Sequence, residues 1–238
     1  MQLRKRLFYV IVMLLILAGY VFFAAQEAQD REAARPEPAP IGVTFDPTES
    51  ADTDQLRDGG FDFIAVQWRP EGRAKTFTTT QRVSTETGFK YAFFLNHQDA
   101  TEDSYDVLYR FDRSRWQRYD GKPLVYVFGG RKLDRDPRFS IVHINDKGGD
   151  QYWVSNPPNI KYGHITLTPG HVSKNLSIDP QRTGAALDQQ EPFAETNKDR
   201  VVLLLWHSWN RQTDNSAISG YPEAYDRVRS FNERWKRP

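Results

Sequence analysis

A stretch near the C-terminal end of the chain combines an apolar run with side chains that can exchange protons. Residues 201–218, "VVLLLWHSWNRQTDNSAI", pass from aliphatic residues into a group of aromatic, cationic and acidic residues. Carboxyl and imidazole side chains are common general acids and bases in enzymes. Asp214 is therefore a candidate general acid and His207 its candidate partner. The other interpretation is structural, in which a buried strand ends here and is followed by a solvated loop.

The same stretch offers groups that bind a ligand without reacting with it. The ring of Trp209 can stack on the flat face of a sugar, although an indole also fills hydrophobic cores. The amide of Asn210 can hydrogen-bond a hydroxyl, and the guanidinium of Arg211 stays charged and can bind an anion. These three residues are predicted substrate contacts.

Short apolar runs from residue 41 onwards indicate the elements that must position these side chains. The runs are "IGVTF", "FDFIAVQW", "KYAFFLN", "KPLVYVFGG", "FSIVHIN", "GHITLTP" and "RVVLLLWHSWN". They are rich in Val, Ile, Leu and Phe without clean alternation, which is typical of parallel strands covered on both faces. Helix-compatible stretches separate them, including "ADTDQLRDGG", "TQRVSTETGF", "SYDVLYRFDRSRWQRYDG" and "YPEAYDRVRSFNERW".

This alternation predicts an α/β fold, a compact (β/α)8 TIM-barrel-like domain, with a doubly wound open sheet as the alternative. About 200 residues is the low end for such a barrel, so some helices must be short or missing. Residues just after the strand ends line the functional rim of a barrel. At these ends lie Asp46, Gln67, Trp68, Asn96, His97, Asn145, Asp146, Gly170, His171 and residues 207–210. Of these, Trp68, Asn96, His97 and His171 are further predicted substrate contacts.

Five segments, in the same order, resemble the landmarks of glycoside hydrolase family 99-like barrels. The segments are "LRDGGFDFIAVQW", "YAFFLNHQDATEDSYDVLYRF", "YDGKPLVYVF", "ITLTPGHVSKNLSIDPQRTGAALDQ" and "LLLWHSWNRQTDNSAI". The family includes endo-α-mannanase and endomannosidase enzymes and relatives in polysaccharide biosynthesis. The resemblance covers residues 41–218 and implies a TIM barrel that acts on or binds glycan.

The sequence departs from the family at the residues that the resemblance implies are catalytic. The family motif Asn-Glu-Trp-x-Glu carries the two carboxylates of the acid/base pair. Here Asn210 is kept, Arg211 replaces the first Glu, and Asp214 falls at the second. His171 stands where the family has the Tyr of a Pro-Gly-Tyr turn.

Glycoside hydrolysis needs both a proton donor and a second group that acts as base or nucleophile, and a guanidinium cannot be that base. The sequence therefore favours a barrel that binds polysaccharide, or supports an envelope assembly, with weak or no hydrolysis. An active hydrolase with a rewired pair, Asp214 with His207 or His171, is the alternative. An unrelated anchored enzyme is a third possibility.

The composition excludes several other classes of function. There are 32 Lys plus Arg against 31 Asp plus Glu, which gives a net charge of +1 and no case for nucleic acid as the main partner. The chain has no cysteine, so disulfides, zinc–thiolate sites and cysteine nucleophiles are ruled out. Its five histidines lack a metal-ligand spacing. We therefore expect no metal and no cofactor.

The N-terminal region predicts a single-pass membrane anchor. A basic start, "MQLRKR", precedes a charge-free apolar segment at residues 7–25, which is near the length needed to cross a bilayer. This segment is longer than the apolar part of a cleaved signal peptide, the alternative interpretation, and Phe23 makes a poor cleavage site. We expect a cytoplasmic stub and anchor at 1–25, a charged and proline-rich linker at 26–40, and the barrel domain at 41–238. The basic flank predicts that the domain is extracytoplasmic, either periplasmic or extracellular.

Overall fold

The computed structural model describes residues 37–49, 52–129, 136–144, 160, 163–169, 180–207, 209 and 218–237, with only the backbone path for 180–186. Within these ranges, Pro38–Arg237 forms one compact unit. The predicted anchor and most of the predicted linker lie outside the described residues. None of the helices in the described ranges has both the length and the apolar character that crossing a bilayer requires.

The elements alternate along the chain as the sequence predicts. The strands are β1 (Ile41–Phe45), β2 (Phe63–Gln67), β3 (Lys90–Asn96), β4 (Arg118–Tyr119), β5 (Lys122–Phe128), β6 (Ser140–Ile144), β7 (His164–Leu167) and β8 (Leu203–Trp206). The α-helices are α2 (Thr53–Asp58), α3 (Arg73–Thr87), α4 (Glu102–Tyr109), α5 (Pro180–Thr196) and α6 (Pro222–Lys236). There are also short 3-10 helices, η1 (Pro70–Gly72), η2 (Lys198–Arg200) and η4 (Ile218–Gly220).

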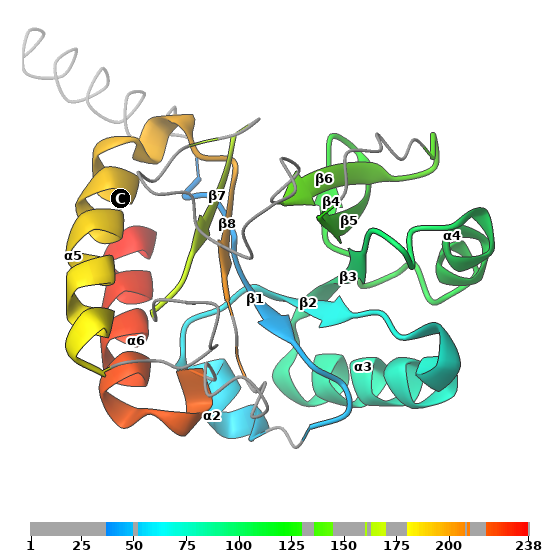
Figure 1. Ribbon diagram of the computed structural model, residues 1–238, viewed down its shortest axis with the longest axis horizontal. Coiled ribbons are helices and arrows are strands. Elements are labelled where there is room, and N and C mark those ends of the chain that lie inside the picture. Colours follow the sequence, from blue (N-terminus) through cyan, green and yellow to red (C-terminus); the bar gives the residue numbers. More distant parts are fainter. Residues whose placement is uncertain are drawn as a thin grey trace, which may run out of the picture. The chain divides into compact units, whose positions relative to one another are not determined.

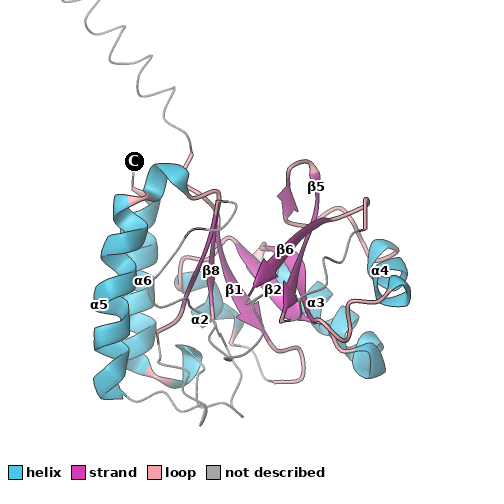
Figure 2. Ribbon diagram, turned by 45° about the horizontal axis from the view of Figure 1, so that its top comes forward, coloured by secondary structure: helices cyan, strands magenta, loops and turns pink. Residues whose placement is uncertain are grey.

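The strands form one curled, mostly parallel sheet with helices around its outer side (Figure 1). Their order is β4-β5-β3-β2-β1-β8-β7, and β6 pairs with β5 on the side opposite β3. Every pairing is parallel except that of β4 with β5, which is a short antiparallel hairpin. Figure 2 shows α5 and α6 beside β8, and α3 and α4 near the other half of the sheet.

The α/β fold with a curled, barrel-like sheet is thus confirmed, and the described residues contribute seven parallel strands to it. One of the eight strands, β4, is a two-residue hairpin arm rather than a barrel strand. Among the described residues β6 and β7 share no strand pairing, so the described strands alone do not form a closed barrel. The open doubly wound alternative fits less well, because the described helices lie on the outer side and the inner side is filled by the sheet's own side chains.

One predicted helix is shorter than its sequence pattern suggests. The pattern in residues 104–121 favours a single helix, but α4 ends at Tyr109. Asp112 then accepts a hydrogen bond from the Ser114 amide in a turn, and Trp116 forms an isolated bridge with Tyr91 of β3. The ring of Trp116 is buried in the core. Burial of this ring against the sheet outweighs the local preference for helix.

Alternate residues of each strand face opposite sides of the sheet, as strand geometry requires. In β2, Ile64 and Val66 belong to the large core cluster between sheet and helices, and Phe63 and Ala65 belong to a second cluster inside the curl. Gly42 of β1 also faces inward, and a Cβ there would lie 2.2 Å from the ring of Phe63. Glycine is needed at this position because the ring fills the interior. The alternation of side chains along each strand therefore decides which residues at the strand ends face the interior of the curled sheet.

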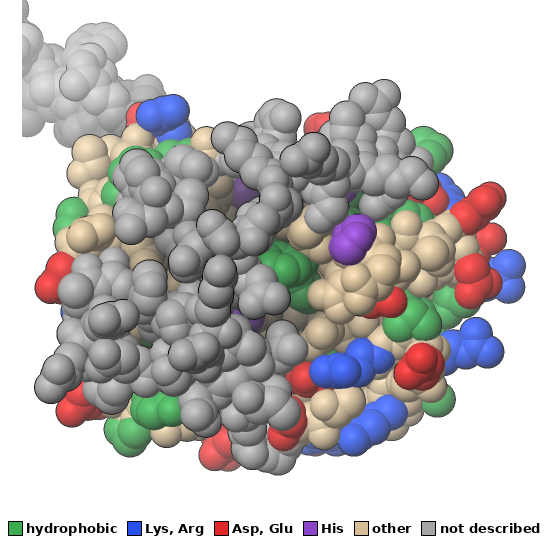
Figure 3. All heavy atoms as spheres, viewed as in Figure 1, with side chains coloured by type: hydrophobic (Ala, Val, Ile, Leu, Met, Phe, Trp, Pro, Cys, Tyr) green, Lys and Arg blue, Asp and Glu red, His purple; other side chains and the backbone are tan. Residues whose placement is uncertain are grey.

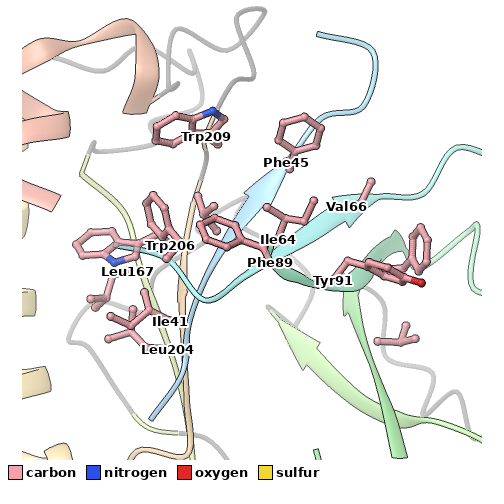
Figure 4. Close-up of a cluster of buried hydrophobic side chains, with 14 of the residues drawn as sticks. Ile41, Phe45, Ile64, Val66, Phe89, Tyr91, Leu167, Leu204, Trp206 and Trp209 are labelled. Carbon is pink, nitrogen blue, oxygen red and sulfur yellow. The ribbon is translucent and has the colours of Figure 1, made fainter. Parts of the chain in front are cut away.

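The outer layer fixes β8, the strand that leads into the opening stretch of polar residues. Trp206 is fully buried and lies next to Leu167 (Figure 4). Its indole Nε1 donates to Asn232 Oδ1 of α6 at 2.9 Å, and Asn232 Nδ2 donates to the Gly59 carbonyl at 2.8 Å. A buried amide that is paired on both sides ties β8, α6 and the end of α2 together.

Candidate functional site

Six polar side chains at the carboxyl ends of five strands lie on the inner side of the curled sheet. We call this set the mouth. Its members are Thr44 and Asp46 from β1, Gln67 from β2, Asn96 from β3, Thr168 after β7, and His207 after β8. The strands are parallel, so their carboxyl ends meet at one edge of the sheet, where α/β proteins bind ligands. All except Asn96 are at least nine-tenths buried, so they are positioned by the fold rather than by solvent.

Asp46 is the charged centre of the mouth. Its carboxylate accepts hydrogen bonds from the Thr48 amide at 2.9 Å and the Thr48 hydroxyl at 2.6 Å. Arg69 Nη2 lies 2.7 Å from the other carboxylate oxygen and 3.3 Å from Gln67 Oε1. Burial alone would raise the pKa of the Asp46 carboxyl, but the hydrogen bonds from Thr48 and Arg69 and the Arg69 charge outweigh it. The net effect holds that pKa below its usual value.

This environment limits what Asp46 can do chemically. At neutral pH the carboxyl is ionised, so it accepts hydrogen bonds and has no proton to donate. A general acid for glycoside hydrolysis has the opposite state, with a raised pKa. Asp46 is therefore suited to binding hydroxyl groups or to stabilising positive charge, and it is unsuited to protonating a leaving group.

His207 lies beside β1 at the inner side of the mouth. Its ring Nδ1 is 3.1 Å from Thr44 Oγ1, and its backbone N–H donates to the Leu167 carbonyl at 2.8 Å. Only 3% of the residue is exposed. The contact with Thr44 fixes the plane of the ring, so the structure holds this predicted residue in a single orientation within the mouth.

Asn96 and His97 lie at the end of β3. Asn96 Nδ2 lies 3.4 Å from Asp99 Oδ2 in the following turn, and the residue is half-buried. His97 is exposed, and its backbone N–H donates to the Phe128 carbonyl at 2.9 Å. Figure 3 shows one face of the protein, on which most of the visible acidic and basic side chains lie towards the margin. Asn96 is thus part of the mouth, and His97 lies beside it at the end of β3.

Burial revises the role expected for Trp68 and Trp209. Trp68 is 2% exposed, packs on Phe77 of α3 and donates from its indole Nε1 to the Ser104 hydroxyl of α4 at 3.1 Å. Trp209 is fully buried and packs against Phe61 and Tyr225, at ring distances of 5.6 and 6.1 Å (Figure 4). Trp68 follows the outward phase of β2, and Trp209, which lies beyond the end of β8, belongs to the same core cluster between sheet and helices. They hold helices onto the sheet and present no face on which a sugar could stack.

The remaining predicted site residues cannot be placed. His171, Asn210, Arg211 and Asp214 lie outside the described residues. The predicted acid Asp214 and its partner His207 therefore remain a prediction, as does the role of Arg211. Within the described ranges, no group of three or more His, Cys, Asp or Glu side chains is arranged to hold a metal ion.

Three residues in or beside the mouth were not anticipated from the sequence. Thr44 lies within an apolar strand, Arg69 follows one, and Thr168 precedes a Pro-Gly pair. Thr168 is held by its amide, which donates to Gln190 Oε1 of α5 at 2.9 Å. The sequence could have identified Thr44, because alternate residues of a strand share a face and Asp46 is two positions further on.

Comparison with known proteins gives a likeness of fold. No protein-family model matches the sequence, and no curated protein matches it. The structure is similar to that of the GH99 endo-α-mannosidase from Bacteroides thetaiotaomicron, solved in complex with BIS-TRIS propane. The TM-score is 0.55 at 9% sequence identity, over 82% of this chain and 97% of that chain. The domain therefore has an α/β fold whose curled parallel sheet resembles the GH99 barrel.

Proposed function

We propose that the domain is a glycan-binding barrel, anchored outside a membrane by residues 1–25, that binds polysaccharide or supports a cell-envelope polysaccharide assembly. Its hydrolytic activity is weak or absent. The observation that carries this proposal is the mouth, a set of buried, oriented polar groups around the ionised Asp46. The GH99-like fold supports it, because the mouth lies at the edge where such barrels bind their ligands.

The chemistry of the mouth suits a sugar. Each sugar hydroxyl both donates and accepts a hydrogen bond, so it needs partners of both kinds. Asp46 accepts only, the amides of Gln67 and Asn96 can do both, and the Thr168 hydroxyl can do both. Hydrogen bonds to a charged acceptor are about twice as strong as neutral ones. Asp46 is therefore the group expected to contribute most to affinity.

Two features support weak or absent hydrolysis. Asp46 is ionised and cannot act as the proton donor. Arg211, at the place of a family carboxylate, is a permanent cation that repels an oxocarbenium-like transition state. At about 4 Å and an effective dielectric near 20, such a repulsion is about 4 kcal/mol, or roughly a thousandfold in rate. The same cation favours an anionic ligand, such as a uronic acid or a phosphorylated glycan.

Calorimetry with neutral and acidic oligosaccharides, run beside a reducing-sugar assay, tests the proposal. We expect binding without turnover, with the acidic series bound more tightly. Arg211→Gln should remove that preference, whereas Arg82→Gln, the same change on the outer face of α3, should leave it intact. Robust turnover that is lost in Asp214→Asn would instead establish the hydrolase alternative. Absence of any glycan binding would leave only a role in assembly.

A further inference from the structure

The edge of the sheet opposite the mouth has a different chemical character. We call it the amino edge, because the strands begin and most helices end there. The chain enters the domain at this edge, where Pro38–Pro40 leads into β1. The Pro40 carbonyl accepts a hydrogen bond from the Leu204 amide at 3.1 Å, so the entry point is fixed to β8. The described chain therefore enters the domain at the amino edge.

Basic side chains are in excess at the amino edge. Lys90 begins β3, Arg118 and Lys122 flank the β4–β5 hairpin, Arg200 precedes β8, and Arg237 follows α6. All five are exposed, and among the described residues none of them forms an ion pair. In the same described part of the chain, the nearby carboxylates without an ion pair are Glu37, Asp112, Asp120 and Asp199, whereas Asp62 is paired with Lys236 at 2.6 Å. Asp112 lies beside two further basic residues without an ion pair among the described residues, Arg113 and Arg115. The amino edge is thus a cationic surface.

The opposite edge has a mixed charge, because α3 begins there with the basic residues Arg73 and Lys75 while other helices begin with acidic ones. The first helical turns, which lie on the side of the mouth, contain Asp54, Glu71, Glu102, Asp103 and Glu223. Acidic residues stabilise helix N-termini and basic ones stabilise C-termini, which accounts for part of this separation. Lys90, Arg118 and Lys122 lie on strands, however, so the helix dipole does not explain them.

An amphipathic hollow lies within the amino edge, where the β4–β5 hairpin meets the start of β8. It has a volume of about 340 Å³, and Pro40, Arg118, Tyr119 and Val202 are among its lining residues. Val202 is 47% exposed, although it directly precedes β8, whose four residues are all buried. A Tyr ring, an exposed aliphatic side chain and a long cation together are typical of surfaces that meet lipid headgroups.

We propose that the amino edge docks on the headgroups of an anionic phospholipid bilayer and directs the mouth away from the membrane. This inference rests on the membrane anchor proposed above. The linker at residues 26–40 spans at most about 50 Å when extended, which keeps the domain within reach of the surface. Each basic residue near an anionic surface changes a binding constant about fivefold, and salt screens the effect.

Site-specific labels test the docked orientation, because the chain has no natural cysteine. Two full-length variants each carry one fluorophore on a new cysteine. Val202→Cys places it at the amino edge, and Glu71→Cys places it beside the mouth. Each protein is reconstituted into vesicles of phosphatidylcholine, with or without phosphatidylglycerol, that contain a headgroup-attached quencher. We expect stronger quenching at position 202 than at position 71 in anionic vesicles. The difference should disappear in neutral vesicles and at about 1 M salt, where the screening length falls to about 3 Å.

Charge variants provide the matched control. Lys90→Gln, Arg118→Gln and Lys122→Gln combined should lower the docking equilibrium about a hundredfold. A control variant removes the same amount of charge from α3 and should leave docking unchanged. It combines Arg73→Gln, Lys75→Gln and Arg82→Gln. Circular dichroism checks that both sets fold. Extraction of the vesicles at alkaline pH tests the anchor separately. If the protein resists extraction but both labels are quenched equally, the docking inference is wrong and the anchor stands. Release at alkaline pH overturns the anchor and this inference with it.

Discussion

Replacing Asp46 by Asn is expected to lower the affinity for oligosaccharide by roughly 10- to 100-fold. A hydrogen bond to a charged group contributes about 1.5–3 kcal/mol, and each 1.4 kcal/mol is about a factor of ten in affinity. The asparagine side chain would keep the size of the original one while losing the charge that Arg69 and Thr48 stabilise. Calorimetric titration of the variant with the best-bound oligosaccharide measures the effect.

Two further variants separate binding from folding. Glu71→Gln removes a carboxylate from the exposed 3-10 helix at the same edge and should leave the affinity unchanged. Thr44→Val removes the contact with His207 Nδ1 and should weaken binding less than the change at Asp46. Unaltered affinity in a folded Asp46→Asn protein would show that glycan does not contact the mouth.

The second large effect concerns the stability of the domain between pH 7 and pH 5. His164 of β7 faces the inside of the curl, 7% exposed, and neither ring nitrogen has a hydrogen-bond partner among the described residues. Its ring packs against those of Tyr119 and Tyr126, at 4.7 and 6.2 Å. Burial lowers the pKa of His164 from 6.5 to about 4. The folded protein therefore keeps this imidazole neutral while the unfolded chain protonates it.

Acid destabilises the folded domain through His164. Between pH 6.5 and 4 the unfolded state binds more protons, so the free energy of unfolding falls as the pH falls. From the two pKa values, His164 costs about 2 kcal/mol of stability on going from pH 7 to pH 5. Urea unfolding at both pH values should show this loss in the natural protein. The loss should be smaller by that amount in His164→Leu and unchanged in His97→Leu, which alters an exposed histidine. Equal losses in all three would contradict a buried neutral His164.

The architecture was predictable because it depends on patterns that are local in sequence. Apolar runs of about five residues bounded by polar stretches identified the strands, and the spacing of Val228, Phe231 and Trp235 identified α6. The pattern failed beyond Tyr109, where the decisive contact is between Trp116 and Tyr91, far apart along the chain. Such long-range packing leaves no trace in a helical periodicity.

The site was predictable only in outline. Position at a strand end correctly placed Asn96, His97 and His207 near the mouth, but it could not show which way each side chain points. Trp68 and Trp209 lie on the outer side, where their rings hold helices in place. The importance of Arg69 depends on its contact with Asp46, and spatial proximity of residues 23 positions apart cannot be read from a single sequence.

Imidazole NMR signals test most directly whether the mouth binds glycan, because histidines lie both at the mouth and away from it. The account predicts that adding the best-bound oligosaccharide to the natural protein shifts the signals of His207, which lies within the mouth. The signals of His164, at the start of β7 on the other edge of the sheet, should stay in place and serve as the internal control. Saturating glycan that shifts the His164 signals and leaves those of His207 unchanged would contradict the account.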